Sequence, residues 1–274
     1  MNNNLRNTSF TNSNEGAISY DLMPPYSMQG IEFIYSNVFQ NKHQIIADIG
    51  SGTGRLTAQL IQNNEIYAVE PDTKMSAVAE AKFKNFSNFH SINGFAEFTT
   101  LNSNSIDFIV VGQALHRFDI AKFKKEAIRI LKNPNNIIIL YNRIDYSIDI
   151  IQDLLMALKS SYSAYKSRFE FENESIGSLI ETQKNCQSID LIYPRHHVYA
   201  YFRNEFIVNE TKFYTLCLSL WIFPLSNGED AQRIIHSKDF NLQKFKCLIK
   251  KIFDKYSTNN LIVLPLSTEV HFPY

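Results

Sequence analysis

A glycine-rich turn between a predicted strand and a predicted helix constrains the fold of this chain more than any other feature. The stretch IIADIGSGTGRL, residues 45–56, opens with an apolar run and continues into a turn that holds Gly50, Gly52 and Gly54. From Leu56 onward, apolar residues recur at helical spacing. Glycines allow a positive φ in such a turn and let a ligand touch the bare backbone. A strand, a tight turn and a helix in this order are typical of a site for an anionic or polar cofactor.

An acidic residue follows the turn at a distance that suits a nucleoside. Glu70 ends the apolar run 66–69, and an acid about 20 residues beyond such a turn accepts hydrogen bonds from ribose hydroxyls. The glycines read G-x-G-x-G, and Arg55 stands where a dinucleotide motif would have its third glycine. The pattern therefore indicates a nucleoside cofactor and disfavours NAD.

Composition and charge narrow the class of protein. The chain has 274 residues, of which 45% are hydrophobic and 20% charged, enough for one large α/β domain or a domain with a substantial insertion. Its 27 basic and 27 acidic side chains balance, so charge gives no reason to expect nucleic acid or an anionic membrane as the main partner. Three distant cysteines without a CxxC pattern argue against a disulfide framework or a zinc site.

The N-terminal segment and the apolar runs bear on location. Residues 1–16 are polar and lack the apolar core of a signal peptide, and no apolar run reaches the length of a membrane span. We expect a cytoplasmic protein whose residues 1–16 form a flexible tail with the capacity to order over a ligand.

Strands and helices alternate through the first half of the chain. The apolar runs predict strands over 45–49, 66–70, 89–93, 105–111 and 136–142. Amphipathic segments between them predict helices, two of which would begin after the N-caps Asp72 and Asp119. This alternation indicates right-handed βαβ units and a parallel sheet.

The regular alternation stops at Arg143. Beyond it, the spacing predicts helices over 148–164, 176–183, 212–221 and 240–256, and a strand over 199–206. Two short apolar runs around Pro265, LIVLPL and TEVHF, predict a terminal hairpin. We expect residues 17–142 and 238–274 to form one domain, with 143–237 inserted as a cap over the carboxyl edge of its strands.

The motifs of residues 48–142, taken together, resemble those of the class I S-adenosylmethionine-dependent methyltransferases, most closely the type 11 branch with small-molecule substrates. The matching pieces, in matching order, are DIGSGTGRLT at 48–57, VEPDTKM at 69–75, GFAE at 94–97, IDFIVVGQALHRFD at 106–119 and RILKNPNNIIILYN at 129–142. The resemblance covers 17–145 well, the terminal hairpin moderately and the cap weakly. It implies an α/β fold with a Rossmann-like, seven-stranded, mostly parallel sheet, helices on both faces, a C-terminal antiparallel hairpin and a mostly helical cap insertion.

The resemblance implies a site for S-adenosylmethionine. Asp48 would balance the ammonium of the cofactor, although capping the glycine turn is an alternative role, and Glu70 would accept both ribose hydroxyls. Phe95 stands where the family often has an acid or a hydroxyl, so it would stack or edge-pack on the adenine instead. The implied cofactor-binding residues are Asp48, Gly50, Ser51, Gly52, Gly54, Glu70, Pro71, Met75, Phe95, Ala96, Gln113 and Ala114.

Catalysis of this kind needs positioning and desolvation more than covalent help. A base is needed only when the acceptor carries a proton of high pKa, as an alcohol or phenol does. His116 would stand at the mouth of the site as a catalytic base, or would belong to the local wall structure instead. The family often shows an Arg-Pro-x-Tyr-Pro pattern upstream, but here Met23 replaces the Arg, so Arg55 or backbone groups would have to hold the cofactor carboxylate. The substrate-binding candidates are Tyr20, Tyr26, Arg117 and Asn142.

A segment rich in rings and cations lies inside the predicted cap: Tyr193, Arg195, His196, His197, Tyr199, Tyr201 and Arg203. It would form a pocket for an aromatic or carboxylate-bearing substrate, or its alternate residues would simply face in and out of a strand. Adjacent histidines without a third ligand rarely bind a metal, and we expect no metal site.

The hypothesis is a methyltransferase that acts on a small molecule, with oxygen as the preferred acceptor, either a hydroxyl or a carboxylate, and specialised metabolism as one setting. The alternatives are N- or C-methylation, including that of a peptide terminus, and a non-catalytic S-adenosylmethionine-binding protein. The sequence names neither the acceptor nor the oligomeric state.

Overall fold

The computed structural model describes residues 17, 20–162, 189–193, 197–218 and 235–273. The predicted N-terminal tail 1–16, the predicted helix 176–183 and two members of the ring-rich segment, Arg195 and His196, lie outside these residues.

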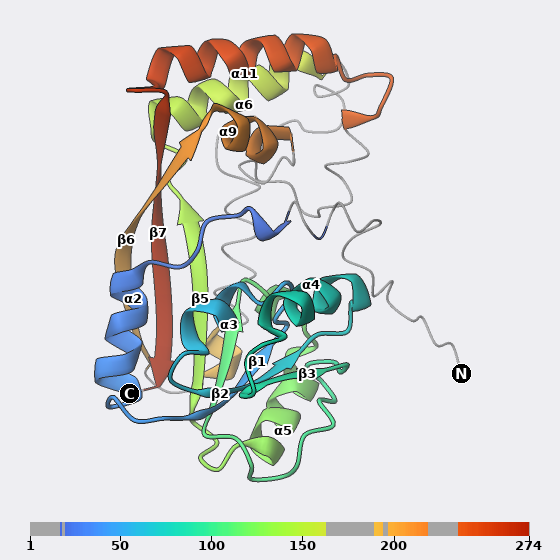
Figure 1. Ribbon diagram of the computed structural model, residues 1–274, viewed down its shortest axis with the longest axis vertical. Helices are drawn as coiled ribbons and strands as arrows, with labels where there is room; N and C mark the ends of the chain where they lie inside the picture. Colours follow the sequence, from blue (N-terminus) through green and yellow to red (C-terminus); the bar gives the residue numbers. More distant parts are fainter. Residues whose placement is uncertain (1–16, 18–19, 163–188, 194–196, 219–234, 274) are drawn as a thin grey trace. The chain divides into compact units, whose positions relative to one another are not determined.

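Seven strands form one mixed sheet in the order β3-β2-β1-β4-β5-β7-β6 (Figure 1). The pairs β1–β2, β1–β4, β2–β3 and β4–β5 are parallel, and β6 and β7 form a C-terminal antiparallel pair. The strand order reverses between β1 and β4, and in open α/β sheets ligands bind outside the carboxyl ends of the strands at such a point. The bounds are β1 Ile45–Ile49, β2 Glu65–Val69, β3 Phe89–Ile92, β4 Phe108–Gly112, β5 Ile137–Ile144, β6 His197–Asn209 and β7 Leu261–Pro273.

The helices follow the predicted alternation. Asp72 accepts hydrogen bonds from the backbone N–H groups of Lys74 and Met75, and Asp119 accepts one from that of Lys122, so both predicted N-caps are confirmed. The helical bounds are α2 Met28–Phe33, α3 Arg55–Leu60, α4 Thr73–Phe83, α5 Ile120–Ile130, α6 Asp149–Ser161, α9 Glu210–Leu218 and α11 Leu242–Tyr256, with a π-helical turn η1 at Ile34–Val38 and a 3-10 turn η2 at Leu115–Arg117.

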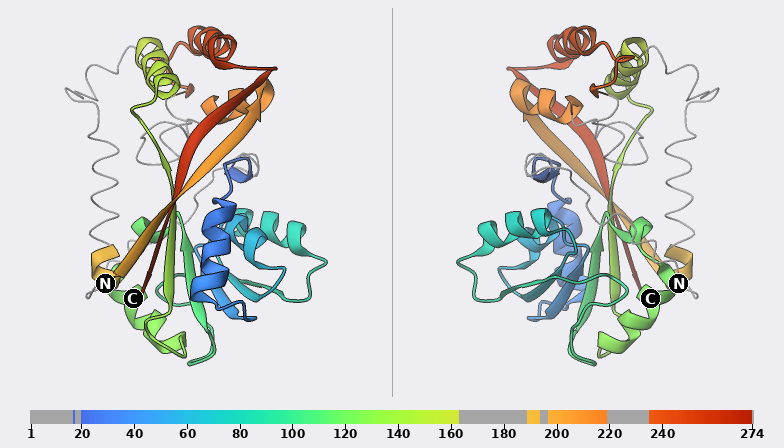
Figure 2. Two further views of the ribbon diagram at one scale, coloured as in Figure 1. Left: turned by 90° about the vertical axis from the view of Figure 1, so that its left-hand side faces the viewer. Right: turned by 90° about the vertical axis from the view of Figure 1, so that its right-hand side faces the viewer.

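Helices cover both faces of the sheet. Successive residues of a strand point to opposite sides, so each strand contributes side chains to the packing on both faces. In β4, Phe108 and Val110 pack with α2, α3 and α4, whereas Ile109 and Val111 pack with α5. The side views show α5 on one side of the strands and α2 and α4 on the other (Figure 2). The predicted Rossmann-like α/β fold is confirmed.

The terminal strand requires a correction to the predicted hairpin. β7 runs without a turn through Pro265, and its antiparallel partner is β6, which precedes it by about fifty residues of intervening chain. The sequence Leu-Pro-Leu-Ser offers no glycine or asparagine for a tight hairpin turn. Proline has no backbone N–H, and it is tolerated at a strand position that does not need to donate a hydrogen bond to a neighbouring strand.

Two compact units divide the described residues differently from the predicted domains. The first holds those up to Arg143, those from 189 to 204 and those from 267 on; the second holds 144–162, 205–218 and 235–266. Helix α11, which was predicted to join the first domain, lies in the second unit because its apolar face packs into the core formed with α6 and α9. The residues of this face are Phe245, Ile249, Ile252 and Phe253.

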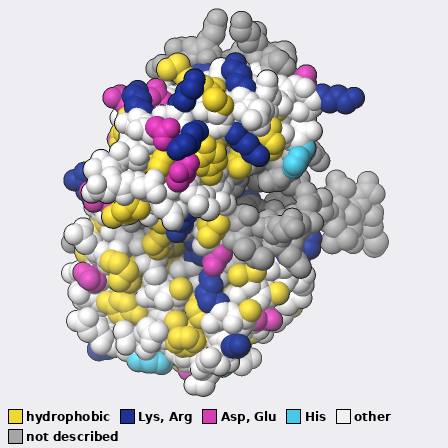
Figure 3. All heavy atoms as spheres, turned by 45° about the horizontal axis from the view of Figure 1, so that its top comes forward, with side chains coloured by type: hydrophobic (Ala, Val, Ile, Leu, Met, Phe, Trp, Pro, Cys, Tyr) yellow, Lys and Arg dark blue, Asp and Glu magenta, His cyan; other side chains and the backbone are white. Residues whose placement is uncertain are grey.

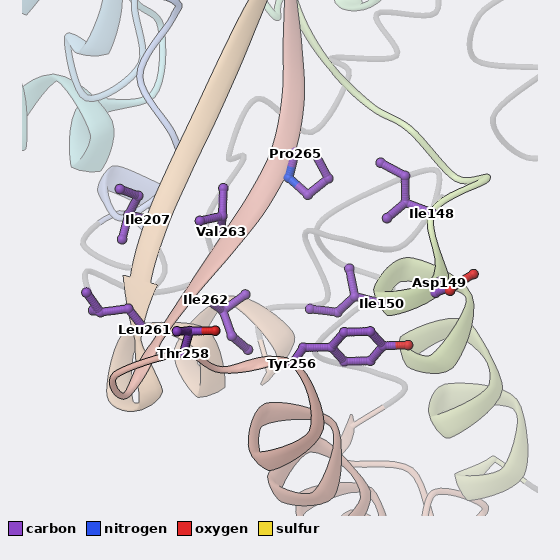
Figure 4. Close-up of a pocket in the computed structure, with 10 residues that line it drawn as sticks. All are labelled: Ile148, Asp149, Ile150, Ile207, Tyr256, Thr258, Leu261, Ile262, Val263 and Pro265. Atoms are coloured by element: carbon purple, nitrogen blue, oxygen red, sulfur yellow. The ribbon is translucent and has the colours of Figure 1, made fainter.

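The second unit has a charged outer surface and an apolar cavity. The exposed lysines of α11 lie among acidic and apolar side chains (Figure 3). A cavity of about 530 Å³ lies between α6, the end of α11 and the strands (Figure 4), lined by Ile148, Asp149, Ile150, Ile207, Tyr256, Thr258, Leu261, Ile262, Val263 and Pro265. Of the helices that the structure describes, none has the length and apolar character needed to cross a membrane.

Candidate functional site

The glycine turn follows β1 directly, and its three glycines play different parts. Gly50, Gly52 and Gly54 all have positive φ, at 70°, 57° and 74°. A Cβ atom on Gly50 would lie 2.7 Å from the Cβ of Ala114, and one on Gly54 would lie 2.5 Å from Cε2 of Phe83. At Gly52 the nearest side-chain atom would be 3.7 Å away. Internal packing therefore excludes a side chain at the outer two positions, whereas a Cβ at Gly52 would meet only ordinary van der Waals contacts with Tyr20 and Met75.

Asp48 lies beneath this turn with one carboxylate oxygen unsatisfied. Its side chain is buried, and Oδ2 accepts a hydrogen bond of 2.7 Å from the Thr57 hydroxyl. Oδ1 is buried and has no hydrogen-bond partner in the described part of the chain. Burial raises the pKa of Asp48 to about 7, against the hydrogen bonds from Thr57. Since buried acceptors without a donor are rare and destabilising, Oδ1 fits a cationic donor such as an ammonium group.

Glu70 follows β2 and connects the glycine turn to the start of α4. Its Oε2 accepts from the backbone N–H of Gly52 and its Oε1 from that of Asp72, both at 2.9 Å. Burial raises its pKa, while these two hydrogen bonds and the charge of Arg117 act in the opposite direction. Each carboxylate oxygen can accept two hydrogen bonds, so each retains one site for a hydroxyl. This geometry suits a vicinal diol.

Two further predicted cofactor contacts, Met75 and Phe95, differ in exposure. Met75 is buried in the first turn of α4, and its Cε would lie 3.9 Å from a Cβ on Gly52. Phe95 is exposed and pairs with Phe98 through two backbone hydrogen bonds, which leaves its ring available for stacking. Of the other predicted adenine contacts, Ala96 is buried and Pro71 is half-buried just after β2.

The segment after β4 is held in a strained conformation. Gln113 has φ of 56°, a value that is uncommon for a residue with a side chain. Its backbone N–H donates to the carbonyl of Leu140, and its Nε2 donates to that of Asn142 at 3.3 Å. His116 and Arg117 follow in η2, and both are exposed. Strain of this kind gathers at functional sites, and here it places His116 at the carboxyl edge of the sheet.

The N-terminal segment is tied to the glycine turn by side-chain contacts that sequence reasoning missed. Asp21 accepts hydrogen bonds from Thr53 Oγ1 at 2.9 Å and from Lys82 Nζ at 2.6 Å. The guanidinium of Arg55 donates to the carbonyl of Pro24. These contacts join positions far apart in the chain and have no local sequence signal. In addition, Tyr20 Cε1 is the nearest atom, at 3.7 Å, to the position that a Cβ on Gly52 would take.

Tyr26 and Asn142, two of the predicted substrate-binding residues, are buried and engaged with the protein. The Tyr26 hydroxyl lies so close to Gly112 that a Cβ there would be 2.4 Å from it. Asn142 Nδ2 donates to the carbonyls of Pro24 and Pro25, and its Oδ1 accepts from Thr268 and Asn204. The side-chain amide of Asn142 thus fixes the N-terminal segment against the sheet, and its substrate-binding role stays a prediction.

The site as a whole fits the cofactor that the resemblance implies. The backbone at Gly52, the unsatisfied oxygen of Asp48 and the paired acceptor sites of Glu70 suit an amino acid joined to a nucleoside. When bound, S-adenosylmethionine supplies a methyl group on a positive sulfur. The cofactor roles of the individual residues stay predictions.

Comparisons with known proteins find a methyltransferase domain in part of this chain. Residues 47–139 match the family model of the methyltransferase domain. An uncharacterised methyltransferase of Schizosaccharomyces pombe is 28% identical over 149 residues, which are 54% of this chain and 58% of that protein. An uncharacterised methyltransferase of Mycobacterium bovis is 27% identical over 132 residues, which are 48% and 51%. The match thus spans about half the length of these curated relatives.

Solved structures agree with the fold. A candidate Type II methyltransferase of Anaeromyxobacter dehalogenans superposes with a TM-score of 0.58 at 17% identity, over 90% of this chain and 95% of that one. A candidate methyltransferase of Anabaena variabilis reaches 0.52 at 16% identity, over 91% and 98%. The match over residues 47–139, the strand order and the glycine turn together identify a Rossmann-like methyltransferase domain, similar to the type 11 family, in this part of the chain.

Proposed function

We propose that this protein transfers a methyl group from S-adenosylmethionine to an oxygen atom of a small molecule, either a hydroxyl or a carboxylate. The observation that carries the choice of oxygen is the sign of the charge at the carboxyl edge of the sheet. Arg117 lies close enough to lower the pKa of Glu70, and Arg143, one residue before the end of β5, keeps both Nη groups beyond its ion pair with Glu269. Positive charges favour an anionic acceptor and disfavour an ammonium.

Each residue of the site has its own role in methyl transfer. Asp48 and Glu70 hold the two ends of the cofactor, and the N-terminal segment at Tyr20 and Asp21 covers the glycine turn and excludes water. His116 takes the proton of a hydroxyl acceptor, whereas a carboxylate acceptor needs no base at neutral pH. Positioning and desolvation supply most of the rate.

Calorimetry tests the cofactor first. S-adenosylmethionine and S-adenosylhomocysteine should both bind, and Glu70→Ala should weaken both by about 10-fold or more, since it removes two charge-assisted hydrogen bonds. Glu65→Ala, which changes a surface carboxylate paired with His90, is the matched control and should leave binding unchanged. Absence of binding to the wild type would overturn the proposal.

Labelled methyl transfer then tests the acceptor. The panel should pair each phenol or carboxylic acid with the amine of the same skeleton, and it should include specialised metabolites, because one solved structure of this fold is described as belonging to an antibiotic biosynthesis pathway. We expect label in the oxygen compounds, with mild alkali releasing it from esters but not from ethers. Transfer to the amines alone would contradict oxygen methylation. Cofactor binding without any transfer would instead support a non-catalytic binding protein.

A cytoplasmic location and a preference against nucleic acid stay predictions from cysteine usage and charge balance. Cell fractionation and a nucleic-acid binding assay with the full chain would test them. A short peptide with a free carboxylate belongs in the acceptor panel, because its carboxylate is also an anionic oxygen acceptor.

A further inference from the structure

A row of aromatic rings lies on β6, on β7 and at Tyr193, all within the first unit. The rings follow one another at close spacing: Tyr193 stacks on His197 at 5.0 Å, His197 lies 5.3 Å from His271, and Tyr199 lies 5.8 Å from His271 and 5.5 Å from Tyr201. We call these five residues the aromatic strip. Tyr199 and Tyr201 are 56% and 60% exposed. Two neighbouring exposed tyrosines offer flat faces and hydroxyl groups to a ligand at low entropic cost.

A buried ion pair anchors the strip. Glu269 accepts hydrogen bonds from Arg143 Nε at 2.6 Å, from His271 Nε2 at 2.8 Å and from the Tyr201 hydroxyl at 3.4 Å. Burial alone would raise the pKa of Glu269, but the His271 hydrogen bond and the charge of Arg143 lower it to about 2. Glu269 is therefore ionised at neutral pH and fixes Arg143 in place.

Arg143 keeps donors for a ligand. Its Cζ lies 4.6 Å from the centre of the Tyr141 ring, so the guanidinium plane is held between that ring and Glu269. Only Nε is engaged with an acceptor among the described residues, which leaves both Nη groups. A guanidinium fixed in this way can bind a carboxylate or phenolate with two N–H groups.

The strip shares its side of the sheet with the segment after β4. Tyr141 and Tyr193 belong to the same core as Ala114 and Leu115, which precede His116. Asn142, next to Arg143, accepts the hydrogen bond from the Gln113 side chain through its carbonyl. The ion pair therefore lies at the carboxyl edge of β5, beside the strained segment that carries the catalytic candidate.

We propose that the aromatic strip and Arg143 form the acceptor surface of the methyltransferase site and select planar aromatic acceptors that bear an anionic oxygen. The inference rests on the proposed function and narrows its substrate class. The rings stack on the plane of the acceptor, and Arg143 binds its anionic group. A saturated acceptor of the same charge loses the stacking, and an uncharged aromatic acceptor loses the ion pair.

Three probes, each differing in one feature, test this surface by calorimetry on the full chain saturated with S-adenosylhomocysteine. The probes are 4-hydroxybenzoate, trans-4-hydroxycyclohexanecarboxylate and 4-hydroxybenzamide. Each aromatic contact should contribute about 2- to 13-fold in affinity, so 4-hydroxybenzoate should bind about 10-fold more tightly than its saturated analogue. It should also bind about 10-fold more tightly than the amide, which lacks the charge.

The double variant Tyr199→Leu/Tyr201→Leu should abolish the preference for the aromatic ring, and it should leave the affinity for S-adenosylhomocysteine unchanged. Both side chains are exposed, so the variant should fold. Tyr214→Leu, on α9 of the second unit, is the matched control and should keep the preference. Equal binding of the aromatic and saturated probes, binding of neither, or a preference that survives the double variant would overturn the inference. A failure of S-adenosylhomocysteine to bind the wild type would instead overturn the proposed function.

Discussion

The Thr57 hydroxyl donates to Oδ2 of Asp48 at 2.7 Å and leaves Oδ1 of the same carboxylate buried without a donor among the described residues. The hydrogen bond fixes the orientation of the carboxylate, and the unsatisfied Oδ1 remains as an acceptor for a ligand. A carboxyl group in this state favours its proton, which is why burial raises its pKa. Burial thus disfavours the ionised carboxylate of Asp48 in the free protein, and a cation bound at Oδ1 would stabilise it.

Asp48 should make the protein less stable as the pH rises from about 4 to about 7. Its pKa rises from 3.8 to about 7 on folding, so between these values the folded protein keeps a proton that the unfolded protein releases. The free energy of unfolding therefore falls with pH across this window and is constant above it. The span from 3.8 to about 7 corresponds to roughly 4 kcal/mol at most. Asp48→Asn should remove this loss.

Urea unfolding of both proteins at pH 5, 6, 7 and 8 would measure the effect. The free energy of unfolding of Asp48→Asn, relative to that of the wild type, should increase at each step up to pH 7. Asp107→Asn, which changes a carboxylate paired with Lys132 at the surface, provides the control and should show no such gain. Parallel curves for the wild type and Asp48→Asn would contradict a raised pKa.

Gly52 and Gly54 should respond differently to alanine. Gly52→Ala places its Cβ in ordinary van der Waals contact with Tyr20 and Met75, so its cost to folding is limited to the left-handed φ of 57°, about 1 kcal/mol. The same Cβ fills the ligand space, and binding of S-adenosylhomocysteine should fall by 100-fold or more. Gly54→Ala sets a Cβ 2.5 Å from Phe83 and should destabilise the fold by several kcal/mol. Thermal unfolding and calorimetry on both variants would separate these effects; equal loss of stability would show that packing excludes a side chain at Gly52 as well.

Asp21 should slow the release of the cofactor. It holds the N-terminal segment to Lys82 and Thr53, and both members of the ion pair are partly exposed, so Asp21→Asn should cost less than about 1 kcal/mol in stability. Release of S-adenosylhomocysteine should become several-fold faster, with little change in the association rate. Stopped-flow displacement would measure both rates, and Lys132→Met, which breaks a comparable surface pair with Asp107, should leave them unchanged. A slower association with unchanged release would show that the segment does not cover the site.

Sequence patterns located the parts of the fold that depend on local interactions. β1 was predicted over residues 45–49 and occupies them, because a buried parallel strand is a continuous apolar run. The cap Asp72 followed from one side chain and the backbone beside it. By contrast, the contacts of Asp21 with Thr53 and Lys82 join positions 32 and 61 apart, and no local pattern encodes them.

The same limit explains the corrections. The partner of β7 could not be predicted, because strand pairing between distant segments depends on tertiary packing, and two apolar runs around a proline suggested a turn instead. Helix α11 was amphipathic in sequence, but the sequence does not say which core its apolar face joins. Likewise, Thr57 carried no signal of its own, since a threonine in the first turn of a helix is common.

His116 should matter for hydroxyl acceptors and not for carboxylates. A hydroxyl must lose a proton during transfer, and a positioned base contributes about 10² to 10⁴-fold in rate. A carboxylate is already ionised at neutral pH. His116→Gln should therefore lower kcat for a phenol or alcohol by at least about 100-fold and leave kcat for a carboxylate within a few-fold of the wild type. His116 is exposed in η2, so the variant should fold. Calorimetry with S-adenosylhomocysteine would check this, because binding should be unchanged. Equal losses for both acceptor classes would assign His116 to the wall of the site and not to proton transfer.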